Sequence, residues 1–577
     1  MKKLVFCLLS FVFCLTGCRH QPTLEIRLNQ VGFAPQQEKT ATIDVASKDA
    51  KPCEVAIVNA NGETVWQGQA SATILNPVSG KPRQIVDFSD LTEEGDYILS
   101  ICRNNDIPLC RDFRIINHPY RELTRKALRA FYYQRASMDI VEPYAEGFTR
   151  KAGHPDDKVL VHPSAATEER PAGTVISSPG GWYDAGDYNK YIVNSGYTMG
   201  VWLMAYEMNK AYFDTLNLNI PPSLEGRGGE RLPDMLAEAM YNIRWMLTMQ
   251  DTDGGVYHKL TEPDFEGFIR PDECQKPRYV VLKTTAAALD FAATMALAAR
   301  VYKPYDPKFC AQAKKAALAA YAWALEHPAV YYDQPALNEA FEPAITTGAY
   351  DDFDVRDEFY WAATELFLLT GDKTFQSKIE NLKSQITDFT PSVWGNVAEL
   401  ADIELGNFDA LLAHLQPYLE EAEKVSVHRG PYGNREEDFF WGCNSEGCCW
   451  RGVECLYAYR LTGDKRYLTN AERCLNYILG QNSTGYCYVT GFGSKPTSHP
   501  HHRLSFSHPK GTHPGFLAGG PNRMRQDAET DGVIYPKDVP ADESYLDEQP
   551  SYASNEVTIN WNVTLFALTA GIDAIQK

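Results

Sequence analysis

Two aspartates stand three residues apart in the segment GGWYDAGDYNKY, residues 180–191, with only an alanine and a glycine between them. Side chains three positions apart on a turn can point the same way, so Asp184 and Asp187 can face one ligand. A helix is expected to begin near Asn189, and the amino end of a helix favours ionised carboxylates. Such a pair is suited to taking a proton from water, as a general base does. An acidic helix cap gives the same pattern and is the alternative.

A glutamate far along the chain is a candidate for the opposite role, that of an acid. Glu556 lies in YLDEQPSYASNEVTINWNV, residues 545–563, just before the last expected helix and among aromatic and apolar residues. Desolvation in such surroundings raises the pKa of a carboxyl group, and a general acid needs this in order to hold its proton at neutral pH. A glutamate that only caps the helix is the alternative.

Between these acids lies a loop that is rich in hydrogen-bond donors, GFGSKPTSHPHHRLS, residues 491–505. Its histidines, His499, His501 and His502, are of the type that binds metals. Adjacent histidines in a proline-rich loop do not easily face one ion, however, and Arg503 would repel a cation. Donors to sugar hydroxyls are the favoured interpretation, with metal binding as the alternative.

The polarity of the sequence has two periods, one typical of strands and one typical of helices. They divide the chain into two parts, whose elements must position these groups. Over residues 24–117 polarity alternates with period two, as in TATIDVA, CEVAIVNANGETVW and DYILSIC, and Asn61-Gly62 is a hairpin signal. Short strands joined by turns predict a small β-sandwich there.

From residue 118 the pattern becomes helical, in Ala/Leu-rich stretches such as TTAAALDFAATMALAARVY and FCAQAKKAALAAYAWALEH. The segments LLTGDKTF and RLTGDKRY, residues 368–375 and 460–467, each follow one helix and open another. Repeated helix pairs predict a closed α/α toroid over residues 118–577, and hence a mainly α protein. Long loops at its mouth are expected to carry the chemistry.

The composition of the 577 residues narrows the classes of partner. Hydrophobic residues make up 44% and aromatic residues 12%, which is enough for a sizeable core, and the net charge is −20. A nucleic-acid footprint needs the opposite sign, so DNA and RNA are not expected partners. An acidic surface rich in aromatic residues suits a neutral ligand such as carbohydrate, although it suits simple solubility equally well.

The first residues, MKKLVFCLLSFVFCLTGC, have the layout of a secretory signal, with two lysines before an apolar core too short to span a bilayer. The run LTGC resembles a bacterial lipobox, which makes residues 1–17 the signal, Cys18 the lipidated first residue and residues 18–23 a short tether. We expect an exported lipoprotein held to the outer membrane by its lipid alone, on the periplasmic or the cell-surface face. An ordinary signal with an incidental cysteine is the alternative.

A cysteine-rich run, CNSEGCC, covers residues 443–449. It lacks the spacing of a zinc knuckle and has no histidine nearby at ligand spacing. We therefore expect buried or disulfide-bonded cysteines there.

Three of these segments together resemble signatures of glycoside hydrolase family 9, the cellulase family built on an (α/α)6 barrel. The Gly-aromatic lead into Asp-Ala-Gly-Asp is present as GGWYDAGDYNKY, and the glycine-rich run that ends in Pro-His-x-Arg as GFGSKPTSHPHHR. The aromatic-x-Asp followed nine residues later by glutamate is present as Tyr545-Leu546-Asp547 and Glu556. The resemblance runs from about Pro119 onward. IRLNQVGFAP, near the start, resembles the immunoglobulin-like module that precedes many such barrels.

The resemblance implies roles for these residues. Asp187 is the general base that activates water, Asp184 helps to hold that water, and Glu556 is the general acid. Asp547 and His501 complete the catalytic group along the cleft. The implied sugar contacts are Arg503, His502, Trp182, Tyr183, Trp441 and Tyr552.

The family needs no cofactor for catalysis but often binds structural calcium, and TTGAYDDFDVRDE supplies oxygen ligands of the right kind. The candidate ligands are Thr347, Gly348, Asp352, Asp357 and Glu358. An acidic loop without a metal is the alternative. Several members also carry a Cys/Cys-His zinc site before the aspartate pair, but residues 151–179 contain no cysteine, so this zinc is not expected.

The resemblance therefore implies an endo-acting, inverting β-1,4-glucanase that acts as a monomer. Its expected substrate is a soluble cellulosic glucan, a mixed-linkage glucan or a xyloglucan. One rival is an exo-acting hydrolase of cello-oligosaccharides or glucosaminides on the same fold. Another is a surface glycan-binding lipoprotein without activity, although that protein would need no acid–base pair.

Overall fold

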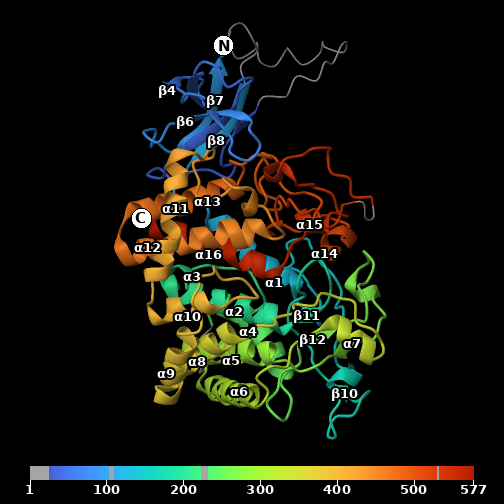
Figure 1. Ribbon diagram of the computed structural model, residues 1–577. Coiled ribbons are helices and arrows are strands. Elements are labelled where there is room, and N and C mark those ends of the chain that lie inside the picture. Colours follow the sequence, from blue (N-terminus) through green and yellow to red (C-terminus); the bar gives the residue numbers. More distant parts are fainter. Residues whose placement is uncertain (1–24, 103–108, 223–231, 529–531, 577) are drawn as a thin grey trace.

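A computed structural model describes residues 25–102, 109–222, 232–528 and 532–576 (Figure 1). The predicted signal, the tether and Cys18 lie outside the described residues. Within the described ranges, no helix is both long and apolar enough to cross a membrane.

Two antiparallel sheets form the N-terminal sandwich. Phe33, Phe88 and Phe113 meet in its core, with ring centroids 5.0–6.2 Å apart. Gly62 has a φ of +80° in the turn between β3 and β4, where Asn61-Gly62 predicted a hairpin. The first sheet has the order β1 (Ile26–Arg27), β2 (Thr40–Asp44), β6 (Pro82–Asp87), β5 (Ile74–Leu75), and the second β4 (Thr64–Gln69), β3 (Glu54–Asn59), β7 (Gly95–Cys102), β8 (Leu109–Ile115).

Buried polar contacts join the sandwich to the helical part. The Arg27 guanidinium donates to the Asp44 carboxylate on β2 and, at 2.5 Å, to the carbonyl of Ser483. Asn29 Nδ2 donates to Asn476 Oδ1 at 2.8 Å. Arg27 and Asn29 are buried, so these contacts between the two parts lie away from the surface.

The helical part is a ring of six successive helix pairs, and in each pair the second helix is the more buried. The last of these helices packs against both α2 and α12 and so closes the ring. The predicted (α/α)6 barrel is therefore confirmed. The pairs are α1 (Arg121–Gln134) with α2 (Ile192–Met208), α4 (Asp234–Thr248) with α5 (Thr285–Val301), α6 (Pro307–Glu326) with α8 (Arg356–Thr370), α9 (Lys373–Lys383) with α10 (Ala398–Leu405), α11 (Asp409–Lys424) with α12 (Trp450–Thr462), and α13 (Lys465–Ile478) with α16 (Ile559–Ile575).

The two LTGDK segments form matching corners between helices. Gly371 and Gly463 end α8 and α12 in the left-handed conformation, with φ of +70° and +71°. Asp372 and Asp464 then cap the next helices, and each accepts a hydrogen bond at 2.9 Å from a backbone amide of the first turn.

A small sheet at the mouth of the barrel was not predicted. Its strands have the order β10 (Val175–Ile176), β9 (Val159–Val161), β13 (Tyr279–Val280), β12 (Lys259–Thr261) and β11 (Lys190–Tyr191). Since β11 directly follows the segment with the two aspartates, this sheet fixes that segment. Helix α2 begins only at Ile192, beyond the expected start near Asn189.

The cysteines of residues 443–449 were expected to be either buried or disulfide-bonded. Cys443, Cys448 and Cys449 are buried thiols without disulfides, in agreement with one of the two predicted forms.

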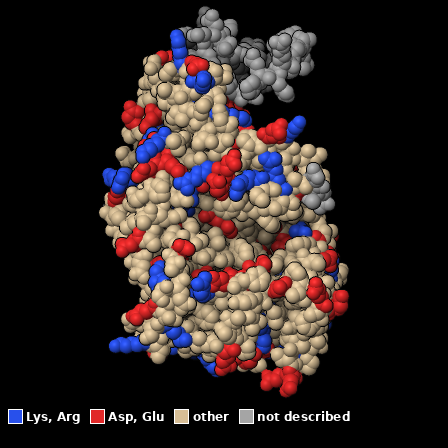
Figure 2. Space-filling view, in the orientation of Figure 1, with Lys and Arg blue, Asp and Glu red and all other residues tan. Residues whose placement is uncertain are grey.

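Basic and acidic side chains are interspersed across the face of the molecule shown in Figure 2.

Candidate active site

Asp184, Asp187 and Glu556 line one cleft with a volume of about 410 Å³. Backbone contacts hold their loops together: the amide of Ile559 donates to the carbonyl of Asp184 at 2.8 Å, and that of Arg503 to Gly186 at 3.0 Å. A Cβ atom on Gly186 would lie 2.3 Å from the carbonyl oxygen of the neighbouring loop, so only glycine allows this approach. The three motifs recognised in the sequence thus meet at one place.

Asp187 is held by three donors that all reach the same oxygen. Asn189 Nδ2 lies 2.5 Å, the Tyr191 hydroxyl 3.1 Å and the Asn189 amide 3.3 Å from Oδ2. Its second oxygen, Oδ1, is left for a ligand in the cleft. This arrangement fixes the carboxylate and leaves it one oxygen with which to accept a proton.

Asp184 is more enclosed than Asp187. Asn194 Nδ2 donates to its Oδ1 at 2.7 Å and the Tyr350 hydroxyl to its Oδ2 at 2.6 Å. Burial, followed by the charge of the neighbouring Asp187, raises the pKa of Asp184 to about 8. The expectation that both aspartates stay charged is therefore wrong for Asp184, because a buried carboxyl next to an acid retains its proton.

Glu556 lies just before α16 in the same cleft. Burial raises its pKa to about 8, and the charges of Asp187 and Asp184 act in the same direction. The nearby Arg503 opposes this shift. Glu556 is therefore protonated at neutral pH, as a general acid must be.

Aromatic rings line the rest of the cleft. Trp441 is 42% exposed and its ring centroid lies 5.5 Å from that of Tyr552, so a flat face is available to a sugar. Tyr350 and Trp394, with centroids 5.0 Å apart, and Trp561 also line the cleft. Neither Tyr350 nor Trp394 was predicted: Tyr350 lies in the segment singled out for calcium ligands, and Trp394 lies in a segment without a recognised motif.

Trp182 and Tyr183 cannot serve as sugar platforms, and this prediction is wrong. Both side chains are fully buried. Trp182 packs between Phe131 and Trp202, with centroids 4.8 and 5.3 Å away, and the Tyr183 hydroxyl is hydrogen-bonded to His154. These aromatic residues hold the aspartate segment against the barrel.

His502 and Arg503 also lie behind the cleft surface. His502 is buried between Ser505 Oγ, at 2.9 Å, and Gln134 Oε1, at 3.3 Å, so its predicted sugar contact is wrong. Arg503 is 6% exposed and donates to the carbonyl of Gly186 at 2.8 Å and to that of Glu266. Its guanidinium therefore acts on the cleft by fastening loops and through its charge on Glu556.

His501 pairs with Glu556 through a β-bridge, Asp547 contacts the loop that carries His501, and the predicted roles of both stay predictions. Asp547 accepts hydrogen bonds from the backbone amides of Ser498, at 2.9 Å, and His499, at 2.8 Å, which shapes the histidine loop. The His501 ring lies 6.0 Å from that of Tyr552.

The predicted calcium ligands fall into two separate groups. Thr347 and Gly348 are held by the buried ammonium of Lys259, which lies 3.2 Å from Thr347 Oγ1 and 2.7 Å from the Gly348 carbonyl. These two oxygens therefore already have a donor within the protein, and their place among the calcium ligands stays a prediction.

The acids Asp352, Asp357 and Glu358 gather around Asp290 of α5. Asp290 was not among the predicted ligands. Both carboxylate oxygens of Asp290 are buried, with no hydrogen-bond partner among the described residues, and the buried carboxyl group of Glu358 contacts only those of Asp352 and Asp357. Burial raises the pKa of Asp290 and of Glu358 well above the usual range, and Asp357 and Asp352 raise it further. Unpartnered buried carboxylates of this kind fit a hard cation such as Ca²⁺.

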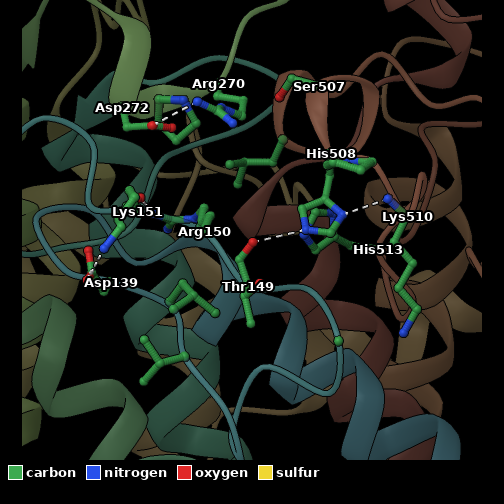
Figure 3. A pocket seen from close by; sticks show the side chains of 16 residues that line it. Asp139, Thr149, Arg150, Lys151, Arg270, Asp272, Ser507, His508, Lys510 and His513 are labelled. Atoms are coloured by element: carbon green, nitrogen blue, oxygen red, sulfur yellow. Dashed lines mark hydrogen bonds and ion pairs between the residues drawn. The ribbon is translucent and has the colours of Figure 1, made fainter.

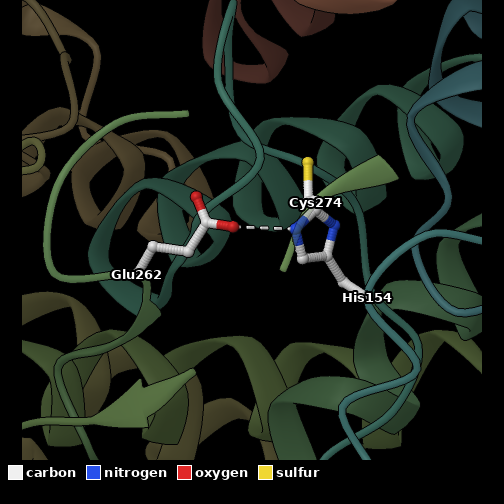
Figure 4. A group of neighbouring side chains, drawn as sticks. All are labelled: His154, Glu262 and Cys274. Carbon is white, nitrogen blue, oxygen red and sulfur yellow. Dashed lines mark hydrogen bonds and ion pairs between the residues drawn. The ribbon is translucent and has the colours of Figure 1, made fainter. Parts of the chain in front are cut away.

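A second group of metal-ligand type consists of His154, Glu262 and Cys274, whose ligand atoms lie within 4.8 Å of one another (Figure 4). Both ring nitrogens of His154 already have partners, Tyr183 and Glu262, each at 2.9 Å. These contacts satisfy the histidine without a metal. The expected lack of a Cys/Cys-His zinc site before the aspartate pair stays a prediction.

Another hollow, of about 560 Å³, lies apart from the acids (Figure 3). Its charged residues form ion pairs with one another, for example Lys151 with Asp139 at 3.6 Å and Arg270 with Asp272 at 3.1 Å. It contains none of the predicted site residues, so we assign the chemistry to the cleft with the three acids.

Known proteins are similar to this chain over most of its length. Residues 120–569 match the model of glycosyl hydrolase family 9, and residues 21–105 match that of the cellulase N-terminal Ig-like domain. A xyloglucan-specific endo-β-1,4-glucanase of Bacteroides ovatus is 46% identical over 98% of this chain and 96% of its own. A solved family 9 structure from Bacteroides ovatus has a TM-score of 0.87 with 45% identity, covering 96% of this chain and 99% of its own. A thermostable endoglucanase of Alicyclobacillus acidocaldarius has a TM-score of 0.82 with 31% identity, covering 95% of this chain and 99% of its own. Because the family model matches most of its length, the chain belongs to glycoside hydrolase family 9.

Proposed function

We propose that the protein is an endo-acting, inverting β-1,4-glucanase. The observation that carries this proposal is the pairing of Asp187, which keeps one oxygen for water, with Glu556, which burial keeps protonated, in one cleft lined by aromatic rings. In an inverting reaction Glu556 protonates the glycosidic oxygen while Asp187 takes a proton from the attacking water. Asp184 helps to orient that water.

Of the three β-glucans expected from the sequence, we propose xyloglucan as the main substrate. The Bacteroides ovatus relative that bears the description xyloglucan-specific aligns over nearly the whole of both chains. The exposed face of Trp441 gives the glucan backbone a surface to stack on.

The function is tested by following the products from xyloglucan, barley glucan, carboxymethylcellulose and cellohexaose over time. An endo-acting enzyme shortens polymers quickly and releases few small sugars at first. Proton NMR in the first minutes should show the α-anomer, because water attacks the face opposite the leaving group. An initial β-anomer would overturn the roles of Asp187 and Glu556.

We also propose that Asp290, Asp352, Asp357 and Glu358 hold a structural Ca²⁺. A cation that binds only the folded protein, at a hundred times its Kd, stabilises it by about 2.7 kcal/mol. Chelation with EDTA should therefore lower the melting temperature by a few degrees, and added Ca²⁺ should restore it. Asp290→Asn should abolish this response, whereas the exposed neighbour variant Asp351→Asn should keep it. A melting temperature that EDTA leaves unchanged in the wild type contradicts the site.

The membrane attachment is a further proposal, supported by the resemblance of residues 15–18 to a lipobox. We propose that lipid on Cys18 tethers a monomeric enzyme to the outer membrane. Cys18→Ser should move the protein from the detergent phase to the aqueous phase in two-phase partitioning, with unchanged activity per molecule, since the barrel begins about a hundred residues later. A wild-type protein that already partitions into water contradicts the anchor.

A further inference from the structure

A further carboxyl group faces the cleft and has no part in the proposed reaction. Glu446 lines the same cleft as Asp184, Asp187 and Glu556 and is half-buried. It lies in a π-helical segment, Asn444–Cys449, which directly precedes α12. Wide turns of this kind are rare and occur often at functional sites.

The neighbouring residues hold this segment firmly. Ser445 Oγ is hydrogen-bonded to Thr564 Oγ1 on α16 at 2.8 Å, in the core of the barrel. At Gly442, with a φ of +86°, a Cβ atom would lie 2.7 Å from the Trp561 ring nitrogen, so the chain passes close to that ring. Glu446 is therefore presented to the cleft by a fixed backbone.

Its carboxyl group retains hydrogen-bonding capacity on the cleft side. Asn560 Nδ2 donates to Glu446 Oε1 at a long distance of 3.4 Å, and Trp561 is the other donor among the described residues. A carboxylate can accept about four hydrogen bonds. Burial raises the pKa of Glu446 to about 8 in the free protein, and hydrogen bonds from the hydroxyls of a bound ligand favour the charged form of its carboxyl group.

The chemistry of the glucan indicates what this carboxyl group binds. In a β-1,4-glucan the oxygens on C1 and C4 are used in the linkages, and that on C6 lies off the ring. The hydroxyls on C2 and C3 are thus the one neighbouring pair of donors on the ring that every unit keeps in the unbranched backbone. Two adjacent hydroxyls match the two oxygens of one carboxylate.

We infer that Glu446 is a substrate-binding residue that accepts hydrogen bonds from the C2 and C3 hydroxyls of a glucosyl unit stacked on Trp441. This inference rests on the proposed function, since it assumes a β-1,4-glucan in the cleft. Glu446 selects units whose paired hydroxyls are free and contributes to binding rather than to the transfer of protons.

A purely structural role makes a different prediction. Asn560 Oδ1 accepts a hydrogen bond from Thr558 Oγ1 at 2.8 Å and a long one from Asn194, which in turn donates to Asp184. If Glu446 served only to hold Asn560, its loss would disturb Asp184 and lower kcat while leaving oligosaccharide affinity unchanged.

The test combines Glu446→Gln with Asp187→Asn, a background in which bound oligosaccharide is not consumed. Calorimetric titration with cellotetraose should give a Kd about tenfold higher for the double variant than for Asp187→Asn alone. One lost hydrogen bond to a charged group has an effect of this size. In the otherwise wild-type enzyme, Glu446→Gln should raise KM by a similar factor and change kcat less than threefold. The exposed variant Glu437→Gln is the matched control and should change neither value.

The other outcomes separate a failure of the role of Glu446 from a failure of the proposed function. An unchanged Kd, or a fall in kcat alone, overturns the role of Glu446 and leaves the proposed function intact. If Asp187→Asn binds no cello-oligosaccharide and the wild type cleaves none, the proposed function itself fails, and the inference fails with it. Thermal unfolding shows whether Glu446→Gln is folded. If it is not, Glu446→Asp, which keeps the charge but not the reach, should give the same rise in Kd, and an unchanged Kd in that variant overturns the inference.

Discussion

Asp187→Asn should lower kcat on xyloglucan by 10²–10⁴-fold, the usual contribution of a general base. The amide has nearly the same shape as the carboxylate but does not accept the proton of the attacking water. The donors Asn189 and Tyr191, which reach one oxygen of Asp187, are neutral and can still hold the side chain in place. Binding of oligosaccharides should therefore survive, and calorimetric titration beside a turnover assay separates the two properties.

Asp184→Asn is the matched comparison and should be less damaging. Asp184 is already protonated at neutral pH, because burial and its neighbour raise its pKa to about 8. Its replacement by a neutral amide changes the charge of the site little. If Asp187→Asn kept more than about a tenth of the wild-type turnover, Asp187 could not be the base.

Glu556→Gln should abolish most activity on natural glucans, by a factor similar to that of the base variant. The amide supplies no acidic proton to the leaving oxygen. On an aryl cellobioside, whose leaving group departs without protonation, Glu556→Gln should keep a much larger fraction of the wild-type rate. Equal losses on xyloglucan and on such an aryl substrate would show that Glu556 is not the acid.

Glu556 also determines the direction in which kcat/KM changes with pH. Burial raises the pKa of Glu556 to about 8, so the acid is protonated below that pH and loses its proton above it. The wild-type kcat/KM should fall as pH rises through about 8, since this ratio reports the groups of the free enzyme. A ratio that stays level up to pH 10 contradicts the role of Glu556.

The architecture could be predicted because its signals are local. The corners at Gly371 and Gly463 need a residue that tolerates positive φ, followed by an aspartate that caps the next helix, and both needs are visible in LTGDK. The helices around these corners are long enough to show their period. The strands of the mouth sheet have two or three residues each, too few for any period, and they were missed.

Most of the wrong predictions at the site concern the direction in which a side chain in a loop points. Trp182 and Tyr183 are adjacent to Asp184 in the sequence, yet they point into the barrel while the aspartate faces the cleft. Glu446 and Asp290 were overlooked because one stands in a cysteine-rich run and the other in an alanine-rich helix. Only the packing of distant segments brings these two carboxyl groups beside their partners.

The position of α16 has a consequence for the order in which the protein is made. This helix joins the first helix pair to the fifth, and Glu556 directly precedes it, so ring and acid are completed together. A growing chain that has already produced Asp184 and Asp187 still lacks some 370 residues before Glu556 is synthesised, and its barrel stays open on one side until then. A chain that ends before Glu556 thus has the base without the acid, and hydrolysis of glucan begins only after the ring has closed.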